Sequence, residues 1–124
     1  MSKRILIIED ELDLIQALKL RLEANGYEIS EALDGQEGLN KAREEKPDLV
    51  ILDIRLPKLD GFKVCRMLKF DEKYQKIPII MLTARIQQAD IQQGIEAGAD
   101  AYITKPYKAA DLLKKIKELL TKNS

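Results

Sequence analysis

Short apolar runs alternate with longer amphipathic stretches five times along this chain, and this alternation constrains the fold more than any other feature. The third run, LVILD, stays apolar until Asp53, as expected of a strand buried on both faces. Regular alternation of strand and helix predicts a parallel sheet with right-handed crossovers and helices on both faces. The expected strands are Lys3–Ile8, Tyr27–Ala32, Leu49–Asp53, Ile77–Leu82 and Ala101–Thr104.

The stretches between these runs carry helix signals. Acids in a first turn and a glycine after the last apolar residue mark helix starts and stops. The spacing of the apolar residues predicts which face of each helix packs against the sheet. The expected helices run to Ala24 before Gly26, over about Gly35–Glu45 after the cap Asp34, from the cap Asp60, over about Gln87–Ala97 before Gly98, and over about Lys108–Thr121. Their expected inward residues include Leu12, Ile15, Leu18 and Leu22, then Phe62, Val64, Cys65, Met67 and Leu68, then Leu112, Leu113, Ile116, Leu119 and Leu120.

The chain is expected to form one domain over residues 1–124, with its core at about 3–121 and a short polar C-terminal tail. No repeat, linker or low-complexity tract divides it. The fold class that follows is α/β, a doubly wound, flavodoxin-like five-stranded parallel sheet. The common strand order for such a sheet is 2-1-3-4-5, which makes the first and third strands neighbours.

Composition excludes several classes of function. The sequence contains no histidine, which removes histidine-based triads, histidine general bases and most zinc sites. Basic and acidic residues balance at 21 each, so no overall field favours nucleic acid or an anionic membrane. The lone Cys65 fits a reducing compartment, and no apolar run reaches membrane-spanning length. We therefore expect a cytoplasmic protein that binds neither membrane nor nucleic acid through this chain.

Polar residues follow the expected strands at the edge where parallel sheets bind ligands. Glu9 and Asp10 follow the first strand, Asp53 ends the third, Thr83 follows the fourth, and Lys105 follows the fifth. Three crowded carboxylates repel one another unless a cation is present, and an all-oxygen ligand set suits Mg²⁺. A lysine and a hydroxyl beside Asp53 suit an anionic phosphoryl group. Together they predict a carboxylate that accepts a phosphoryl group with Mg²⁺ present.

Each of these residues also has an ordinary structural interpretation. Asp53 is of a type that often forms turns or caps helices at strand ends. Thr83 is suited to capping the next helix, and Lys105 to a solvated surface. The functional interpretation is favoured because all of these residues are expected at one edge of the sheet.

The chain resembles a response regulator receiver domain, of the kind found in two-component signalling and chemotaxis, over essentially its whole length. The matching segments, in order, are ILIIEDE, PDLVILDIRLPKLDG, IPIIMLTA and AGADAYITKPY. The resemblance implies that Asp53 is the phosphoacceptor and that Glu9 and Asp10 are its acid pair. It implies metal binding by the side chains of Asp10 and Asp53, with Glu9 nearby, and by the backbone carbonyl of Arg55, with Mn²⁺ as a substitute for Mg²⁺.

The resemblance also implies the moving parts and the partners. Thr83 would hold a phosphoryl oxygen and shift on activation, Lys105 would pair with the phosphoryl group, and Tyr102 would be the aromatic switch. The Lys105–Pro106 peptide bond would be cis. The donor would be a histidine kinase or a histidine phosphotransfer protein, since this chain has no histidine of its own. Such a domain is not an enzyme in the usual sense: it catalyses only its own phosphorylation and slow autodephosphorylation.

Two departures from the family pattern stand out. Arg55 and Ala84 occupy variable positions beside the phosphorylation site that modulate dephosphorylation in the family. One branch of the family dimerises through a face formed, in this chain, by the expected helix at about Gln87–Ala97, the strand Ala101–Thr104 and the last helix. That branch usually has an acidic pair before the tyrosine of this strand, where this chain has Asp100 and Ala101. We therefore expect a monomer or a weak dimer through that face, either as a stand-alone receiver or as part of a longer regulator with an unidentified effector.

Other classes of function remain open as alternatives. A phosphatase of the haloacid dehalogenase type also forms an aspartyl phosphate, but it places an acid two residues after the nucleophile, where this chain has Arg55. A nucleotide-binding module would need a glycine-rich loop after the first strand, where Glu9 and Asp10 stand instead. A receiver fold that signals by docking without phosphorylation is the remaining alternative.

Overall fold

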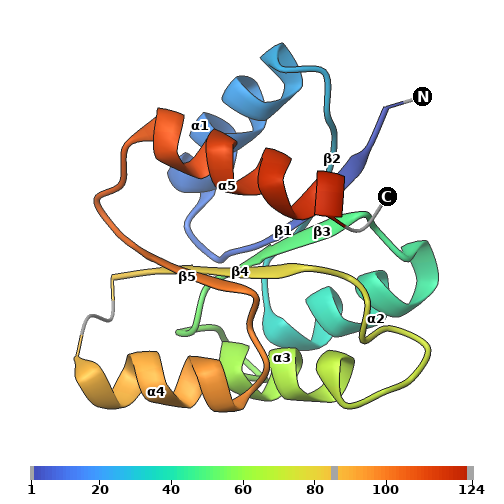
Figure 1. The fold of residues 1–124 in the computed structure, drawn as a ribbon, viewed down its shortest axis with the longest axis vertical. Helices are drawn as coiled ribbons and strands as arrows, with labels where there is room; N and C mark the ends of the chain where they lie inside the picture. Colours follow the sequence, from blue (N-terminus) through green and yellow to red (C-terminus); the bar gives the residue numbers. More distant parts are fainter. Residues whose placement is uncertain (1, 85–86, 123–124) are drawn as a thin grey trace.

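The computed structural model describes residues 2–84 and 87–122. Within them, strands and helices alternate from the N-terminus (Figure 1). Asn123 and Ser124 of the expected tail lie outside these residues. The elements are β1 (Arg4–Ile8), α1 (Leu12–Ala24), β2 (Glu28–Ala32), α2 (Gly35–Glu45), β3 (Leu49–Leu52), α3 (Gly61–Lys69), β4 (Ile79–Thr83), α4 (Gln88–Glu96), β5 (Ala101–Thr104) and α5 (Ala109–Lys122).

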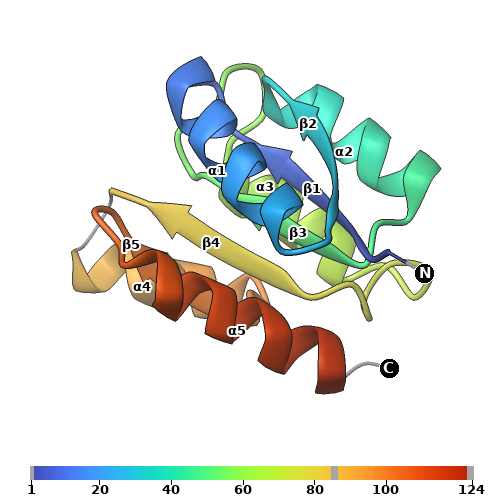
Figure 2. The same ribbon diagram turned by 90° about the horizontal axis from the view of Figure 1, so that it is seen from above.

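The sheet is parallel throughout, and its strand order is β2-β1-β3-β4-β5. The expected fold class and strand order are thereby confirmed. Helices α1 and α5 cover one face of the sheet, and α2, α3 and α4 cover the other (Figures 1 and 2). β1, β3 and β4 lie in the middle of the sheet between these two layers. Their apolar runs are therefore continuous because both faces of each strand are covered.

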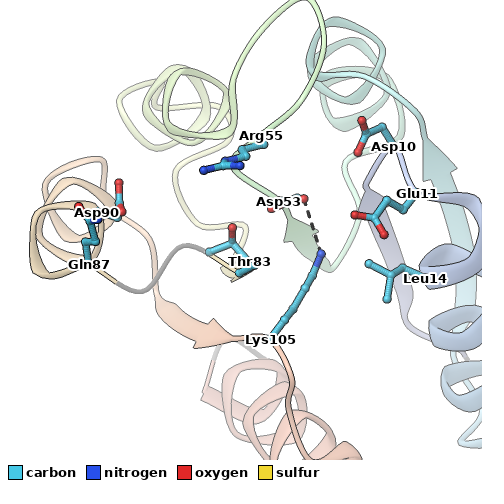
Figure 3. Close-up of a pocket in the computed structure, with 10 residues that line it drawn as sticks. Asp10, Glu11, Leu14, Asp53, Arg55, Thr83, Gln87, Asp90 and Lys105 are labelled. Atoms are coloured by element: carbon cyan, nitrogen blue, oxygen red, sulfur yellow. Dashed lines mark ion pairs between the residues drawn. The ribbon is translucent and has the colours of Figure 1, made fainter.

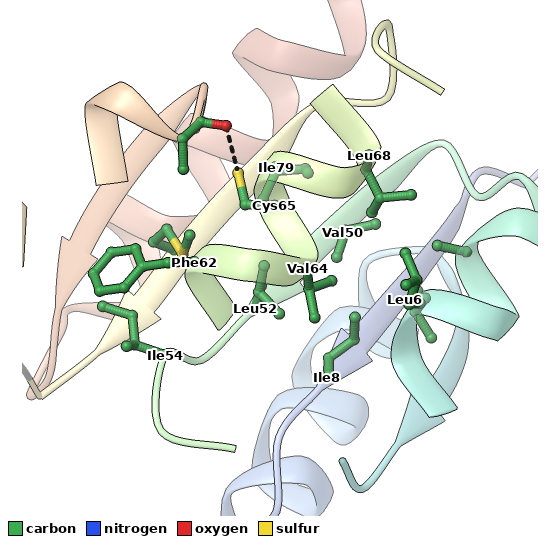
Figure 4. Close-up of a cluster of buried hydrophobic side chains, with 14 of the residues drawn as sticks. Leu6, Ile8, Val50, Leu52, Ile54, Phe62, Val64, Cys65, Leu68 and Ile79 are labelled. Atoms are coloured by element: carbon green, nitrogen blue, oxygen red, sulfur yellow. Dashed lines mark hydrogen bonds between the residues drawn. The ribbon is translucent and has the colours of Figure 1, made fainter. Parts of the chain in front are cut away.

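Alternate residues of the central strands enter two separate apolar clusters. Ile7, Ile51 and Ile80 point into the cluster formed with α1 and α5. Leu6 and Val50 point to the opposite face, into a cluster that includes residues of α2 and α3 (Figure 4). The period of two along each strand produces this division.

Helix caps and stops follow the sequence signals. Asp34 and Asp60 cap α2 and α3, and their side chains accept hydrogen bonds from the backbone amides of Glu37 at 2.7 Å and Lys63 at 3.1 Å. Gly26, which follows α1, has a φ of 90°, a conformation that residues with a side chain rarely adopt. These capping predictions are confirmed.

Two predicted inward residues are wrong. Leu12 is 60% exposed and Met67 is 42% exposed. Leu12 is the first residue of α1, where the helix has not yet come to lie over the sheet. On α3 the buried side chains are those of Phe62, Val64, Cys65 and Leu68, so Met67 does not lie on the face that packs against the sheet.

A polar network holds the start of β4 against α3. The ammonium of Lys69, at the end of α3, lies 2.6 Å from Asp100 Oδ2 and donates to the carbonyl of Ile77 at 2.7 Å. The same carboxylate oxygen accepts the backbone amide of Ile79 at 2.7 Å. This network fixes the strand at its amino end.

Cys65 is buried in the cluster on the α2–α3 face, and its thiol donates to the carbonyl of Ala97 at 3.5 Å. Burial raises the pKa of this thiol to about 12. The thiol therefore stays protonated at neutral pH and acts as a packing group, as its sequence context suggested.

The two-sided burial of the central strands yields a stability prediction. Ile7→Ala removes a fully buried side chain from β1 and should lower the free energy of unfolding by about 2–5 kcal/mol. Leu20→Ala is the matched control, because this α1 side chain is 75% exposed, and it should change stability by no more than about 0.5 kcal/mol. Urea unfolding followed by circular dichroism measures both changes, and equal losses would contradict this description of the core.

Candidate phosphoryl-acceptor site

At the carboxyl ends of all five strands, backbone hydrogen bonds extend beyond the last residues of the strands themselves. The backbone amide of Glu9 donates to the carbonyl of Ala32 at 3.0 Å, and that of Asp53 donates to Ile8 at 3.1 Å. The amide of Lys105 donates to the carbonyl of Thr83 at 2.8 Å. These bonds continue the hydrogen-bonding pattern of the sheet by one residue. They place the polar residues at its edge.

The acids that follow β1 and β3 form one cluster. Glu9, Asp10 and Asp53 each offer a carboxylate oxygen, and these oxygens all lie within 4.8 Å of one another. Glu9 is 4% exposed and Asp53 is 8% exposed, while Asp10 is open to solvent. All-oxygen donors with one solvent-facing side match what Mg²⁺ requires, so the residues present fit that ion.

Lys105 supplies positive charge beside two of these acids, Glu9 and Asp53. Its ammonium lies 2.8 Å from Glu9 Oε1. It also lies 3.6 Å from Asp53 Oδ2, the ion pair drawn as a dashed line in Figure 3. Burial alone would lower the pKa of Lys105, but the hydrogen bond with Glu9 and the charge of Asp53 raise it above its ordinary value. The side chain therefore stays cationic at neutral pH.

Glu9 is held at both of its carboxylate oxygens. Oε1 accepts from Lys105, and Oε2 accepts the backbone amide of Glu11 at 3.2 Å. Burial raises the pKa of the Glu9 carboxyl above its ordinary value, and Asp53 raises it further; the bond from Lys105 opposes both effects. The lysine, or another cation, therefore favours the charged form of Glu9 in this position.

The loop after Asp53 folds back on the site. Asp53 Oδ1 accepts the backbone amide of Ile54 at 2.7 Å, and the amide of Gly61 donates to the carbonyl of Ile54 at 2.8 Å. A Cβ atom at Gly61 would lie 2.1 Å from the carbonyl oxygen of Asp53, so only glycine allows this approach. This role of Gly61 was not predicted from the sequence, although a glycine directly after a helix cap is a signal that could have suggested it.

A pocket of about 820 Å³ opens over these groups (Figure 3). It brings together Asp10, Asp53, Thr83 and Lys105 from four strands, with Arg55 from the loop after β3. Thr83 is 1% exposed. Residues at the pocket that the sequence analysis did not single out are Glu11, Leu14, Gln87 and Asp90.

Tyr102 does not line this pocket. It lies on β5 opposite Met81 of β4, is partly buried, and packs against the cluster on the α2–α3 face. The Lys105–Pro106 peptide bond that follows β5 is cis.

Comparison with known protein families identifies the family of this chain. The family model described as the response regulator receiver domain matches residues 5–117. This chain belongs to that family. It is the receiver domain of a two-component response regulator.

Two similar proteins of known function are regulators of transcription. The chain is 42% identical to the alkaline phosphatase synthesis transcriptional regulatory protein PhoP of Bacillus subtilis, over 99% of this chain and 50% of that protein. It is 44% identical to the DNA-binding dual master transcriptional regulator RpaA of Synechocystis, over 94% of this chain and 48% of that protein. The receiver thus spans about half the length of these relatives.

Solved structures agree over the whole domain. The receiver domain protein (CheY-like) of Methanospirillum hungatei superposes with a TM-score of 0.93 at 36% identity, covering 99% of this chain and 97% of that one. The signal receiver domain of a histidine kinase from Syntrophus aciditrophicus gives a TM-score of 0.91 at 37% identity, covering 97% and 91%. Among the described helices, none has the length and apolar character needed to cross a membrane.

The charge balance at the site yields a prediction. Lys105→Met leaves Glu9 and Asp53 buried without their cation, and in the presence of a chelator it should lower the free energy of unfolding at pH 7 by about 1–3 kcal/mol. Lys115→Met, which removes an exposed ion pair with Glu118, should cost no more than about 1 kcal/mol.

The pH dependence of this loss has a definite sign. An acid whose pKa is raised by folding contributes stability at low pH that is lost as the pH rises through its folded-state pKa. Without Lys105 the pKa of the Glu9 carboxyl is raised further. The loss of stability in Lys105→Met should therefore shrink as the pH falls and Glu9 takes up a proton. Chemical unfolding at several pH values measures this. A deficit that is constant or that grows on acidification would contradict it.

Proposed function

We propose that this receiver accepts a phosphoryl group on Asp53 from the phosphohistidine of a histidine kinase or a histidine phosphotransfer protein. The observation that carries this proposal is the placement of Asp53 beside Asp10 and the Lys105 ammonium at a single pocket, with the buried Glu9 next to them. Such an arrangement has a cation-binding side and an anion-binding side. A carboxylate that forms an acyl phosphate needs both.

The reaction forms a P–O bond to a carboxylate oxygen of Asp53 and breaks the P–N bond of the donor. The electron pair of the P–N bond returns to the donor imidazole. Ile54 holds Oδ1 by its amide, which fixes the direction of the nucleophile. Lys105, now 3.6 Å from Oδ2, is close enough to pair with a phosphoryl oxygen once the group is attached, and buried Thr83 supplies a hydroxyl at the same pocket.

Asp10 and Asp53, with Glu9 beside them, would hold Mg²⁺, and the backbone carbonyl of Arg55 is the further ligand that the family pattern implies. When bound, the ion supplies positive charge that offsets the charge on the phosphoryl oxygens. Glu9 is already engaged by Lys105, which leaves Asp10 as the acid most open to solvent and to an incoming ion.

The output is a population shift rather than turnover of a substrate. A new phosphoryl group draws Lys105 and Thr83 toward it, and Tyr102 moves inward into the space that Thr83 leaves. The face formed by α4, β5 and α5 then changes its relative populations. A near-complete reversal of such an equilibrium needs about 5 kcal/mol of differential interaction. The effector that recognises this face is a separate domain or protein.

A phosphatase of the haloacid dehalogenase type is a second candidate, because it too uses an aspartyl phosphate. The exposed cation of Arg55 stands two residues after Asp53, where that chemistry requires an acid. A receiver that acts by docking alone would not need the acids, Thr83 and Lys105 together at one pocket. The receiver interpretation therefore accounts for more of the site.

Phosphorylation of Asp53 can be tested by intact mass. With Mg²⁺ and acetyl phosphate, the wild-type protein should gain one phosphoryl group, and Asp53→Asn should gain none. Asp48→Asn is the matched control at the opposite end of the same strand, since an asparagine oxygen can still accept the bond from the Arg4 amide. It should label like the wild type.

Labelling of Asp53→Asn at the wild-type level would overturn the proposal, as would an unlabelled wild type. Rapid and continuing hydrolysis of simple phosphate esters would favour the phosphatase. Chelation of the metal should abolish labelling in every variant.

The metal site has its own test, independent of phosphorylation. Mg²⁺ at about one hundred times its dissociation constant should stabilise the folded protein by about 2.7 kcal/mol, because only the folded chain gathers the acids. Asp10→Asn should remove most of this gain, whereas Asp13→Asn, an exposed acid of α1, should keep it. Thermal unfolding with and without Mg²⁺ measures the difference, and an undiminished gain in Asp10→Asn would contradict the assignment.

A further inference from the structure

A glycine lies in the interior of α4 without a backbone reason to be there. Gly94 is buried in the helix Gln88–Glu96, and the described glycines with positive φ are Gly26 and Gly98. Glycine inside a helix is less stable than alanine, because it loses more conformational freedom on folding. The cost calls for an explanation in packing.

The explanation is the ring of Tyr102. A Cβ atom at position 94 would lie 2.9 Å from Cδ2 and 3.2 Å from Cε2 of that ring, and 3.8 Å from Cε1 of Phe62. The first distance is shorter than carbon atoms tolerate. The ring of Tyr102 can lie against α4 in this position only because residue 94 has no side chain.

This contact differs from that of Gly38, which is buried within α2. Gly38 of α2 lies against Ile8, which is fully buried in β1 and has no route to solvent. Tyr102 is on the edge strand β5 and is only partly buried, so its ring can leave. The absence of a side chain at Gly94 therefore decides whether the Tyr102 ring can lie against α4 or must turn toward solvent.

The contact is also linked to the loop that follows Asp53. Phe62, the other ring beside Gly94, follows Gly61, whose backbone lies too close to the carbonyl of Asp53 for a side chain to fit. α3 and α4 cover the same face of the sheet (Figure 1), and Phe62 lies at the end of the buried cluster in Figure 4. The space that receives Tyr102 is thus bounded by β5, α4 and the first turn of α3.

We propose that Gly94 is a positioning residue for the Tyr102 switch: its missing side chain creates the slot between β5 and α4 that the ring occupies. This inference rests on the proposed function, because the slot matters for signalling only if Tyr102 responds to phosphorylation. A methyl group at position 94 expels the ring toward solvent. The position of the Tyr102 ring then no longer depends on whether Asp53 is phosphorylated.

A thermal double-mutant cycle tests the slot without any phosphorylation. Gly94→Ala should lower the melting temperature in the wild-type background, because the methyl group and the ring collide. In a Tyr102→Ala background the same substitution should raise it by about 3 °C, because helix propensity then acts alone. A shift of the same sign and size in both backgrounds would overturn the proposal.

Folding failures also decide the question. If Gly94→Ala does not fold and the double variant does, the ring is the cause and the proposal stands; failure in both backgrounds would refute it. Gln93→Ala is the control, since this neighbour on α4 is exposed. It should give the same small shift in both backgrounds, and a reversal of sign there would show a helix-wide effect and overturn the assignment to Gly94.

The ring itself can be followed by ¹⁹F NMR of fluorotyrosine-labelled protein, with Tyr102→Phe identifying its signal among the four tyrosines. In the wild type this signal should move when acetyl phosphate and Mg²⁺ are added. In Gly94→Ala it should be solvent-like before and after, while the protein still gains a phosphoryl group. A Gly94→Ala signal identical to that of the wild type would refute the slot. Absence of labelling in both proteins would sink the proposed function and leave the thermal cycle to decide the slot alone.

Discussion

The structure depends on backbone hydrogen bonds that continue past the ends of the strands. The amides of Glu9, Asp53 and Lys105 each bond to the carbonyl of a residue at the end of the adjacent strand. Parallel strands are staggered and twisted, so side chains beyond their ends have no fixed relation unless the ladder extends to them. Here the ladder does extend, and three charged side chains from three strands are placed together on rigid backbone.

That rigidity has an electrostatic consequence. Two acids with little exposure and a third beside them would be unstable alone, and the single ammonium of Lys105 lies against the two buried ones. An added anion on Asp53 competes with Glu9 for the same lysine, while an added cation relieves the repulsion among the acids. The site therefore responds to an added charge of either sign through the position of Lys105. Without an added ion, this one lysine is shared between Glu9 and Asp53, so the acids are only partly neutralised.

Much of this was predictable from the sequence because it follows from local rules. Continuous apolar runs placed the buried strands. Alternation with helices indicated a parallel sheet, for which the observed strand order is the common one. The chemistry at the edge followed from which residue came after each run, as for Asp53 and Lys105. The capping roles of Asp34 and Asp60 needed only their immediate neighbours.

The parts that were not predicted depend on approach between distant elements. Leu12 and Met67 satisfy helical spacing, but whether a helix covers the sheet at that residue is decided by its packing angle. Gly61 and Gly94 matter because of what lies opposite them, a carbonyl in one case and an aromatic ring in the other. Gln87 and Asp90 reach the pocket from the first turn of α4, whose position the sequence does not specify.

The division of the apolar residues into two clusters has a consequence for how the domain responds to a local change in packing. A change of volume in the layer of α1 and α5 is absorbed by neighbours on that side of the sheet, because alternate strand residues separate it from the other layer. The two layers are therefore packed independently of each other. The strands are shared by both layers, and the charged residues of the site follow the ends of these same strands, so a change in either layer reaches the site through the strands.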